Sequence, residues 1–142
     1  MDSVHGEMTA LLDRQSAAMS TKDIDRLMAL YSPDVVYFDT VPPLRYVGSA
    51  ALRGRFQEWF GGWQGKFQVD IRDLQVVASG DLAVAHRFSR ARGTLTNGQE
   101  AGSWVRATSC CRRSNHRWLI VHEHVSWPVD VKSGRVVLDQ SP

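Results

Sequence analysis

The segment that decides the fold runs from Trp118 to Trp127 and reads WLIVHEHVSW. Its density of β-branched and aromatic residues is typical of a β-strand. Successive side chains on a strand point to opposite sides, so the segment has two faces. One face is apolar apart from a single carboxylate and consists of Val121, Glu123, Val125 and Trp127. The other face consists of His122, His124 and Ser126.

Three more long strands are predicted upstream of this segment, over residues 67–77, 82–93 and 103–113. The turns that separate the four strands are short and rich in Gly, Asn, Asp and Ser, and they are Ser79-Gly80-Asp81, Thr96-Asn97-Gly98 and Ser114-Asn115-His116. Long strands joined by tight turns predict an antiparallel meander. The C-terminal residues 128–142 contain one further predicted turn, at residues 132–135.

Two helices are predicted at the N-terminus. Apolar side chains between Met8 and Met19 recur at steps of three and four residues, which indicates an amphipathic helix. Asp23 is a suitable cap for a second, short helix, and Pro33 is expected to end it. A strand is predicted next, over residues 35–39.

A third helix is predicted to begin near Ser49, as its N-cap, and to close at Gly61-Gly62. The face of this helix that carries bulky apolar side chains consists of Leu52, Phe56, Trp59, Phe60 and Trp63. Helices gathered on one side of a curved antiparallel sheet make an α+β domain. We therefore expect one domain over residues 1–142: a cone-shaped sheet wrapped around the long third helix, with two further N-terminal helices and an apolar pocket inside the cone.

Composition narrows the class of protein. Apolar residues make up 43% of the 142 positions and the formal net charge is +2, which fits a globular domain. The arginines alternate with apolar residues, so no nucleic-acid partner is expected. No apolar run reaches about 20 residues and no secretory signal is present, which predicts a cytoplasmic protein without a membrane partner. The adjacent Cys110 and Cys111 are expected to be reduced thiols.

Three features together resemble the bacterial ketosteroid isomerases: Ala29-Leu30-Tyr31-Ser32-Pro33-Asp34, a strand ending in Asp39, and Gly48 followed by a helix. The closing strand resembles another branch of the same superfamily, which contains the SnoaL-like cyclases and the association domain of the calmodulin-dependent kinase. The resemblance implies the nuclear transport factor 2-like, cystatin-like fold. It also implies a pocket that works without a cofactor.

The resemblance places Asp39 where the isomerases keep their catalytic base, although an Asp at this point could also simply begin the turn before Pro42. Gln15 falls at the position of the oxyanion-binding Tyr, and Thr108 falls near the second donor. Gln15 is a weaker acid than a phenol, which argues against steroid isomerisation itself.

Glu123 needs a partner if it is buried, and Arg106 and Arg87 on the preceding strands are the candidates. Glu123 could form an acid and base pair with Asp39, with Arg106 helping to position a substrate. Alternatively, a Glu–Arg bridge merely fixes the sheet.

The remaining predicted ligand-binding residues are mostly aromatic and are Tyr37, Phe56, Trp59, Trp63, Trp104, Trp127, Val125, Arg87 and Thr108. Large rigid rings suit a planar polycyclic ligand, although a helix stripe is by default core. His122 and His124 have a spacing that suits two metal ligands, but the sequence identifies no third. No metal or cofactor is therefore expected.

The leading hypothesis is a cofactor-free isomerase or cyclase that acts on an apolar carbonyl-containing or polycyclic metabolite. One alternative is a binding protein that releases such a metabolite unchanged, and another is an assembly domain. A homodimer through the outer face of the sheet is expected under all three, because that face carries apolar residues that need cover.

Overall fold

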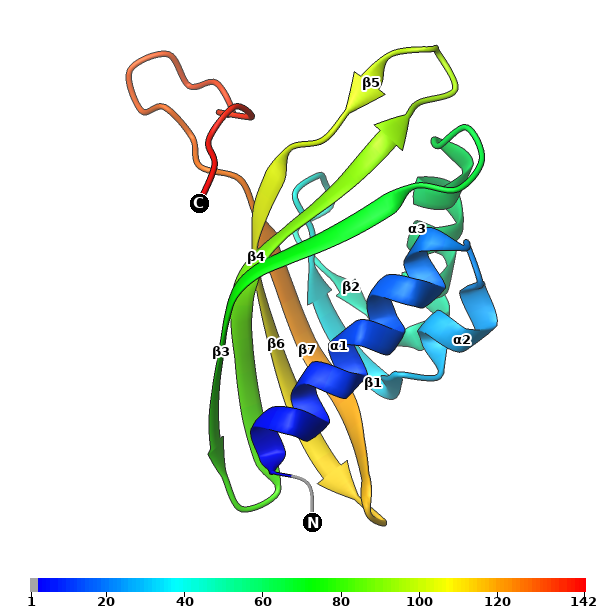
Figure 1. Ribbon diagram of the computed structural model, residues 1–142, viewed down its shortest axis with the longest axis vertical. Helices are drawn as coiled ribbons and strands as arrows, with labels where there is room; N and C mark the ends of the chain where they lie inside the picture. The colour runs from blue at the N-terminus through cyan, green and yellow to red at the C-terminus, as the bar shows by residue number, and fades with distance from the viewer. Residues whose placement is uncertain (1–2) are drawn as a thin grey trace.

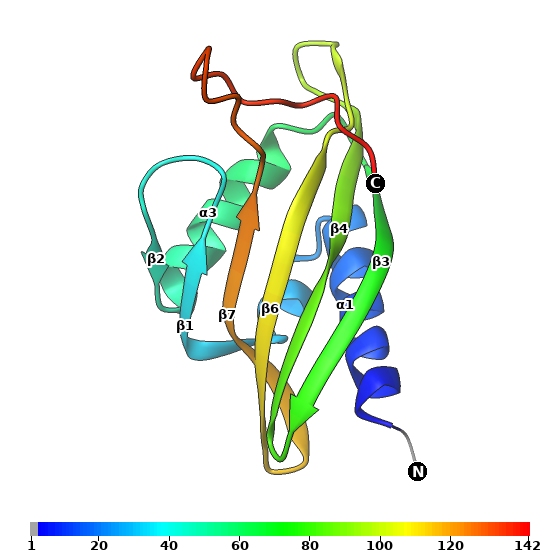
Figure 2. The same ribbon diagram turned by 90° about the vertical axis from the view of Figure 1, so that its left-hand side faces the viewer.

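The computed structural model describes residues 3–142. Three helices and seven strands follow in the order α1 (Val4–Ser20), α2 (Ile24–Met28), β1 (Tyr31–Phe38), β2 (Tyr46–Val47), α3 (Ser49–Gly61), β3 (Gln68–Ser79), β4 (Leu82–Thr94), β5 (Glu100–Ala101), β6 (Trp104–Ser114) and β7 (Arg117–Ser126). The helices lie on one side of a curved sheet, and the opposite side of the sheet is uncovered (Figures 1 and 2). The predicted α+β architecture is confirmed. No helix within residues 3–142 is long and apolar enough to cross a membrane.

The strand order in the sheet is β2-β1-β7-β6-β4-β3, with the short β5 paired to β4. The four long strands form the predicted antiparallel meander. The expectation of a wholly antiparallel sheet is wrong at one place, because β1 pairs with β7 in parallel. A strand pattern does not specify the direction of its partner, and no tight turn joins these two strands.

The start of β1 differs from the sequence prediction. Asp23 caps α2 as expected, with its side chain accepting from the backbone N–H of Arg26 at 3.1 Å. However, α2 ends at Met28 and β1 already begins at Tyr31, so Pro33 lies inside the strand. The register between β1 and β7 shifts between Tyr31 and Val36, and an irregular stretch tolerates a residue without an N–H.

The expectation of a long third helix is also corrected. α1 is the longest helix, with 17 residues against 13 in α3. The N-cap of α3 is Gly48 rather than Ser49, and its φ of 90° belongs to the region that favours glycine. The sheet therefore curves over two helices, α1 and α3, and not around α3 alone (Figure 1).

A β-bulge interrupts β7. Cys110 pairs with His122 and Cys111 pairs with Ile120, so Val121 is an extra residue opposite the β6 ladder. Trp118 and Ile120 are buried before the bulge, and Glu123 is buried after it. The predicted continuous face from Val121 to Trp127 therefore holds only from Glu123 onward.

Candidate functional site

A cavity of about 380 Å³ lies between the helices and the concave face of the sheet. Most of the ligand-binding residues predicted from the sequence line it, namely Gln15, Tyr37, Asp39, Phe56, Trp59, Trp63, Arg87, Glu123, Val125 and Trp127. Aromatic rings make up much of the α3 wall, where Trp59 stands edge-on to Trp63 with ring centroids 6.2 Å apart.

Three connecting segments border the cavity at one end of the sheet. Val41 follows β1, Ser103 lies between β5 and β6, and Leu138 comes from the C-terminal segment. These segments lie at the same end of the molecule in Figure 2. Val41 is 37% exposed and Leu138 is 52% exposed, so this end of the cavity borders solvent. The predicted turn near residues 132–135 is present, closed by a 2.9 Å hydrogen bond from the Asp130 N–H to the Arg135 carbonyl.

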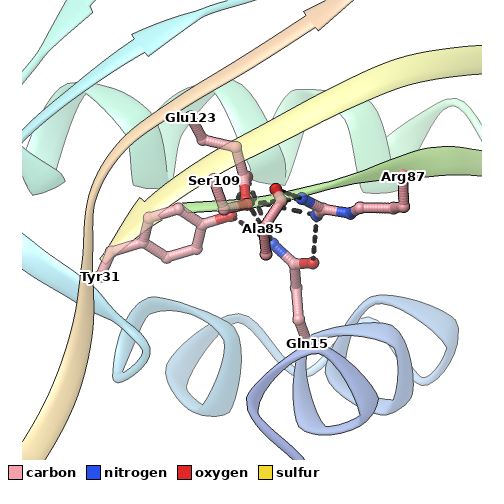
Figure 3. Close-up of polar contacts among 6 residues, drawn as sticks. All are labelled: Gln15, Tyr31, Ala85, Arg87, Ser109 and Glu123. Atoms are coloured by element: carbon pink, nitrogen blue, oxygen red, sulfur yellow. Dashed lines mark hydrogen bonds and ion pairs between the residues drawn. The ribbon is translucent and has the colours of Figure 1, made fainter. Parts of the chain in front are cut away.

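Glu123 is the centre of a buried polar network (Figure 3). The hydroxyls of Tyr31 and Ser109 each donate to its carboxylate at 2.5 Å. The Gln15 amide donates to Oε2 at 3.0 Å, and Arg87 Nη2 lies 3.6 Å from the same oxygen. The network joins α1, β1, β4, β6 and β7 through one carboxylate that is 2% exposed.

The other atoms of this network also have partners. Arg87 Nη1 donates to Ser109 Oγ at 2.7 Å, and Arg87 Nη2 donates to Gln15 Oε1 at 3.2 Å. The Gln15 amide also donates to the Tyr31 hydroxyl at 2.9 Å. Burial and the charge of Glu123 raise the pKa of Tyr31 well above its ordinary value, so the phenol stays protonated and donates. Gln15 therefore has no free amide hydrogen for a ligand oxyanion.

Asp39 forms a second ion pair on the cavity wall. Arg55 Nε on α3 donates to Asp39 Oδ2 at 2.7 Å, and the Thr40 N–H donates to Oδ1 at 2.6 Å. The Asp39 side chain is 10% exposed. A carboxylate offers about four lone-pair positions. The Thr40 hydroxyl also donates to Oδ1, at 3.3 Å, so both oxygens of Asp39 are engaged. These three hydrogen bonds leave Asp39 about one acceptor position on the cavity wall, whereas Tyr31, Ser109 and Gln15 together donate four hydrogen bonds to the Glu123 carboxylate.

Tyr37 lies between the two ion pairs. It stands opposite Glu123 in the β1–β7 register and two residues before Asp39. Burial and the charges of Glu123 and Asp39 raise its pKa well above the ordinary value, and the charges of Arg87 and Arg55 oppose this shift. Its hydroxyl is therefore a neutral donor at physiological pH.

Three predicted site residues lie outside the cavity. Trp104, Arg106 and Thr108 point to the outer face of the sheet because the inward residues of β6 are Ala107, Ser109 and Cys111. Arg106 donates to Ser126 Oγ at 3.0 Å, so of the two candidate arginines it is Arg87 that pairs with Glu123. Trp104 is covered by the Arg72 and Arg90 guanidinium groups, 4.9 and 4.6 Å from its ring centroid.

Three site residues are not predicted by the sequence. Arg55 sits between the apolar positions of α3, and Ser109 resembles an ordinary strand residue. Tyr31 falls before the predicted strand of residues 35–39, because Pro33 is expected to end the second helix. Only the cross-strand register, which pairs Ser109 with Glu123, identifies Ser109 as a partner.

His122 and His124 have a structural role on the outer face. Both rings pack edge-on against Phe38, with centroids 4.7 and 5.3 Å away. His122 Nδ1 is 2.7 Å from the Val36 carbonyl oxygen. Within residues 3–142 no group of three His, Cys, Asp or Glu side chains is arranged to hold a metal ion.

Residues 8–130 match the family model described as the SnoaL-like domain. No functionally curated protein matches the sequence significantly. A crystal structure of a nuclear transport factor 2-like protein of unknown function from Pseudomonas putida KT2440 is similar over 98% of this chain and 96% of its own. Its TM-score is 0.88 and its sequence identity is 29%.

Two other solved structures bear on the possible roles of the fold. A protein from Xanthomonas campestris, provisionally described as a calcium/calmodulin-dependent protein kinase II association domain, is 25% identical with a TM-score of 0.77 over 88% of each chain. A protein from Streptomyces avermitilis, provisionally described as a dehydratase of the same superfamily, is 20% identical with a TM-score of 0.75. The match covers 87% of this chain and 94% of that one, and at this identity it shows the fold alone.

Proposed function

The chain belongs to the SnoaL-like domain family, and from this membership and the geometry of the cavity we propose that it binds a small apolar metabolite and moves a proton on it. The nuclear transport factor 2-like superfamily predicted from the sequence is confirmed. The fold hosts many functions, so the proposal has to rest on the site. The reaction we propose is an isomerisation, a cyclisation or a related proton transfer, with Asp39 as the base.

The observation that carries the proposal is the difference between the two carboxylates on the cavity. Glu123 accepts from Tyr31, Ser109 and Gln15 and has a cation beside it, so it is the anchor of the network. Asp39 is held in place by Arg55 and still has room for another hydrogen. A positioned carboxylate with free acceptor capacity next to an apolar cavity is suited to act as a general base.

Deuterium exchange tests this proposal without knowledge of the natural substrate. The probe is 2-tetralone, a neutral bicyclic ketone with acidic hydrogens beside its carbonyl. We expect the protein to accelerate deuterium incorporation from D₂O, followed by NMR, and Asp39→Asn to lower that acceleration by about 100-fold or more. Asp34→Asn, an identical change on an exposed residue of β1, the strand that Asp39 follows, is the matched control. Equal exchange by wild type and Asp39→Asn would overturn the role of Asp39.

Native mass spectrometry of the purified protein tests the binding part of the proposal. We expect a co-purified small molecule, identified after extraction, that is lost when the cavity is filled by Ala107→Phe. Ala107 lies on the cavity wall within the sheet. A ligand that leaves chemically unchanged, combined with no exchange of 2-tetralone, would favour a binding protein without catalysis.

An assembly domain is the second candidate, favoured by the 25% identity to the protein from Xanthomonas campestris. A plugged cavity would support it, whereas the cavity here borders solvent at Val41 and Leu138. The predicted homodimer through the outer sheet face stays a prediction, which the mass of the native species measures.

A further inference from the structure

The Tyr37 hydroxyl is a polar group of the cavity that is both unpaired and accessible, and among the unpaired hydroxyls of the described lining residues it is the one closest in sequence to Asp39. Tyr37 lines the cavity and is 5% exposed as a residue. Its hydroxyl has no hydrogen-bond partner among residues 3–142. The fully enclosed side-chain atoms without a partner in that range are Ser16 Oγ, Arg87 Nε and Trp127 Nε1, and the Tyr37 hydroxyl is not one of them. The hydroxyl is therefore reached from the cavity.

Asp39 directly follows Phe38, the last residue of β1, and lies two positions after Tyr37. Residues two apart on a strand share a face and are separated by about 7 Å. That is the spacing of the Cα atoms, and the charge of Asp39 helps to raise the pKa of Tyr37, so the two side chains act on the same part of the cavity. One ligand could therefore accept a hydrogen bond at its carbonyl oxygen and make a contact at the neighbouring C–H. Both side chains line the same cavity.

The charges around the cavity decide the class of ligand. In each of the two ion pairs, Arg55 with Asp39 and Arg87 with Glu123, the positive and the negative charge cancel. Among the described residues that line the cavity, both cations already have a carboxylate partner, so a ligand carboxylate would enter at a high desolvation cost. A neutral oxygen acceptor needs only a donor, and the Tyr37 hydroxyl is one.

We propose that Tyr37 is a catalytic residue whose hydroxyl donates a hydrogen bond to the carbonyl oxygen of a neutral ketone or related carbonyl compound, while Asp39 removes a proton from the adjacent carbon. This inference rests on the proposed function and specifies its substrate class. It also moves the oxyanion donor away from Gln15, whose amide is engaged with Glu123 and Tyr31.

The proton transfer balances without any further reactant. Asp39 takes a hydrogen from the carbon beside the carbonyl, and the electron pair of that C–H bond forms a C=C bond. The π electrons of the carbonyl move onto its oxygen, which the Tyr37 hydroxyl stabilises by its hydrogen bond. Protonated Asp39 then returns a proton to the same carbon or to another carbon of the enolate.

The test compares 2-tetralone with tetralin, which has the same bicyclic skeleton but no carbonyl. Tyr37→Phe is expected to weaken 2-tetralone binding by about 5-fold to 10-fold, the effect of one lost hydrogen bond, and to leave tetralin binding unchanged. Deuterium exchange should fall by about 100-fold. Tyr46→Phe is the matched control, because Tyr46 pairs with Tyr37 across β1 and β2 and does not line the cavity.

The infrared carbonyl band of bound 2-tetralone gives a readout that a structural role would not produce. We expect a shift to lower frequency in wild type and in Tyr46→Phe, and its loss in Tyr37→Phe. If 2-tetralone binds and exchanges but Tyr37→Phe behaves like Tyr46→Phe, the role of Tyr37 is overturned and the proposed function stands. If neither probe binds wild type, both fall together. Tighter binding of 2-naphthoate than of 2-tetralone would overturn the assignment of a neutral ligand.

Discussion

Arg87 Nη2 lies 3.6 Å from Glu123 Oε2, although the two residues sit on β4 and β7 with β6 between them. Both side chains are almost fully buried, at 4% and 2% exposure. Ser109 fills the gap on β6, since it accepts from Arg87 and donates to Glu123. Removal of one member of a buried, hydrogen-bonded ion pair leaves the other charge without compensation.

Glu123→Gln is therefore expected to lower the free energy of unfolding by about 3–5 kcal/mol. The uncompensated guanidinium of Arg87 is the physical reason. Denaturant titration followed by circular dichroism measures the change. Glu58→Gln is the control, because Glu58 is 78% exposed and 4.0 Å from Arg55, and it should cost less than about 0.5 kcal/mol. Equal costs for the two variants would show that the network contributes little to stability.

Gly93→Ala should destabilise the end of the cavity near Trp63. A Cβ at this position would lie 3.0 Å from Phe67 Cβ and 3.4 Å from Trp63 Cε3, in a packed region that has little room to adjust. We expect a loss of about 1–3 kcal/mol in the free energy of unfolding. Gly61→Ala, in open space on α3, should be neutral or stabilise by up to about 1 kcal/mol. A neutral Gly93→Ala would mean that β4 and Phe67 can separate freely.

Stability should fall as the pH rises above about 10. The unfolded chain releases the protons of Tyr31 and Tyr37 near the ordinary value of 10.0, whereas burial and the charge of Glu123 raise the pKa of both residues in the folded protein. The folded state then holds more protons than the unfolded state, so its stability is complete below pH 10 and is lost above it. Tyr37→Phe should make the fall shallower by up to about 1.4 kcal/mol per pH unit. An unchanged slope in denaturation curves between pH 9.5 and 11.5 would contradict this.

The two adjacent thiols should differ in reactivity. Cys111 is 1% exposed, and burial together with the charge of Glu123 raises its pKa to about 12. Cys110 is half-buried on the outer face, and burial raises the pKa of its thiol as well. At pH 8 iodoacetamide should label one cysteine of the native protein slowly and both cysteines in denaturant, as counted by mass spectrometry. Cys110→Ser should abolish the native labelling, and persistent labelling of that variant would show that Cys111 is accessible.

The elements were largely predictable because the local patterns are strong. Tight turns with Gly, Asn and Asp locate the ends of the four long strands to within a few residues. The single Glu123 among apolar neighbours identifies the inner face of β7. The partner of Glu123 was harder to predict. The choice between Arg87 and Arg106 depends on which residues of β4 and β6 face inward, and the sequence does not fix that cross-strand register. Arg55 was not predictable, because an amphipathic pattern identifies the apolar positions of a helix and not the partners of its polar side chains.

The bulge at Val121 shifts by one residue the alternation of inward and outward side chains along β7. Before the bulge, even-numbered residues such as Ile120 point into the core. After the bulge, odd-numbered residues such as Glu123 do. One strand of ten residues thus contributes the buried apolar side chains of Trp118 and Ile120 at one end and the buried carboxylate of Glu123 toward the other. In relatives that have one residue fewer between the positions of Ile120 and His122, the inward positions would be conserved in space. An ungapped alignment would nevertheless pair the buried carboxylate with an outward histidine. Functional residues on this strand should therefore be matched between relatives by the face of the sheet on which they lie, and not by their position in an ungapped alignment.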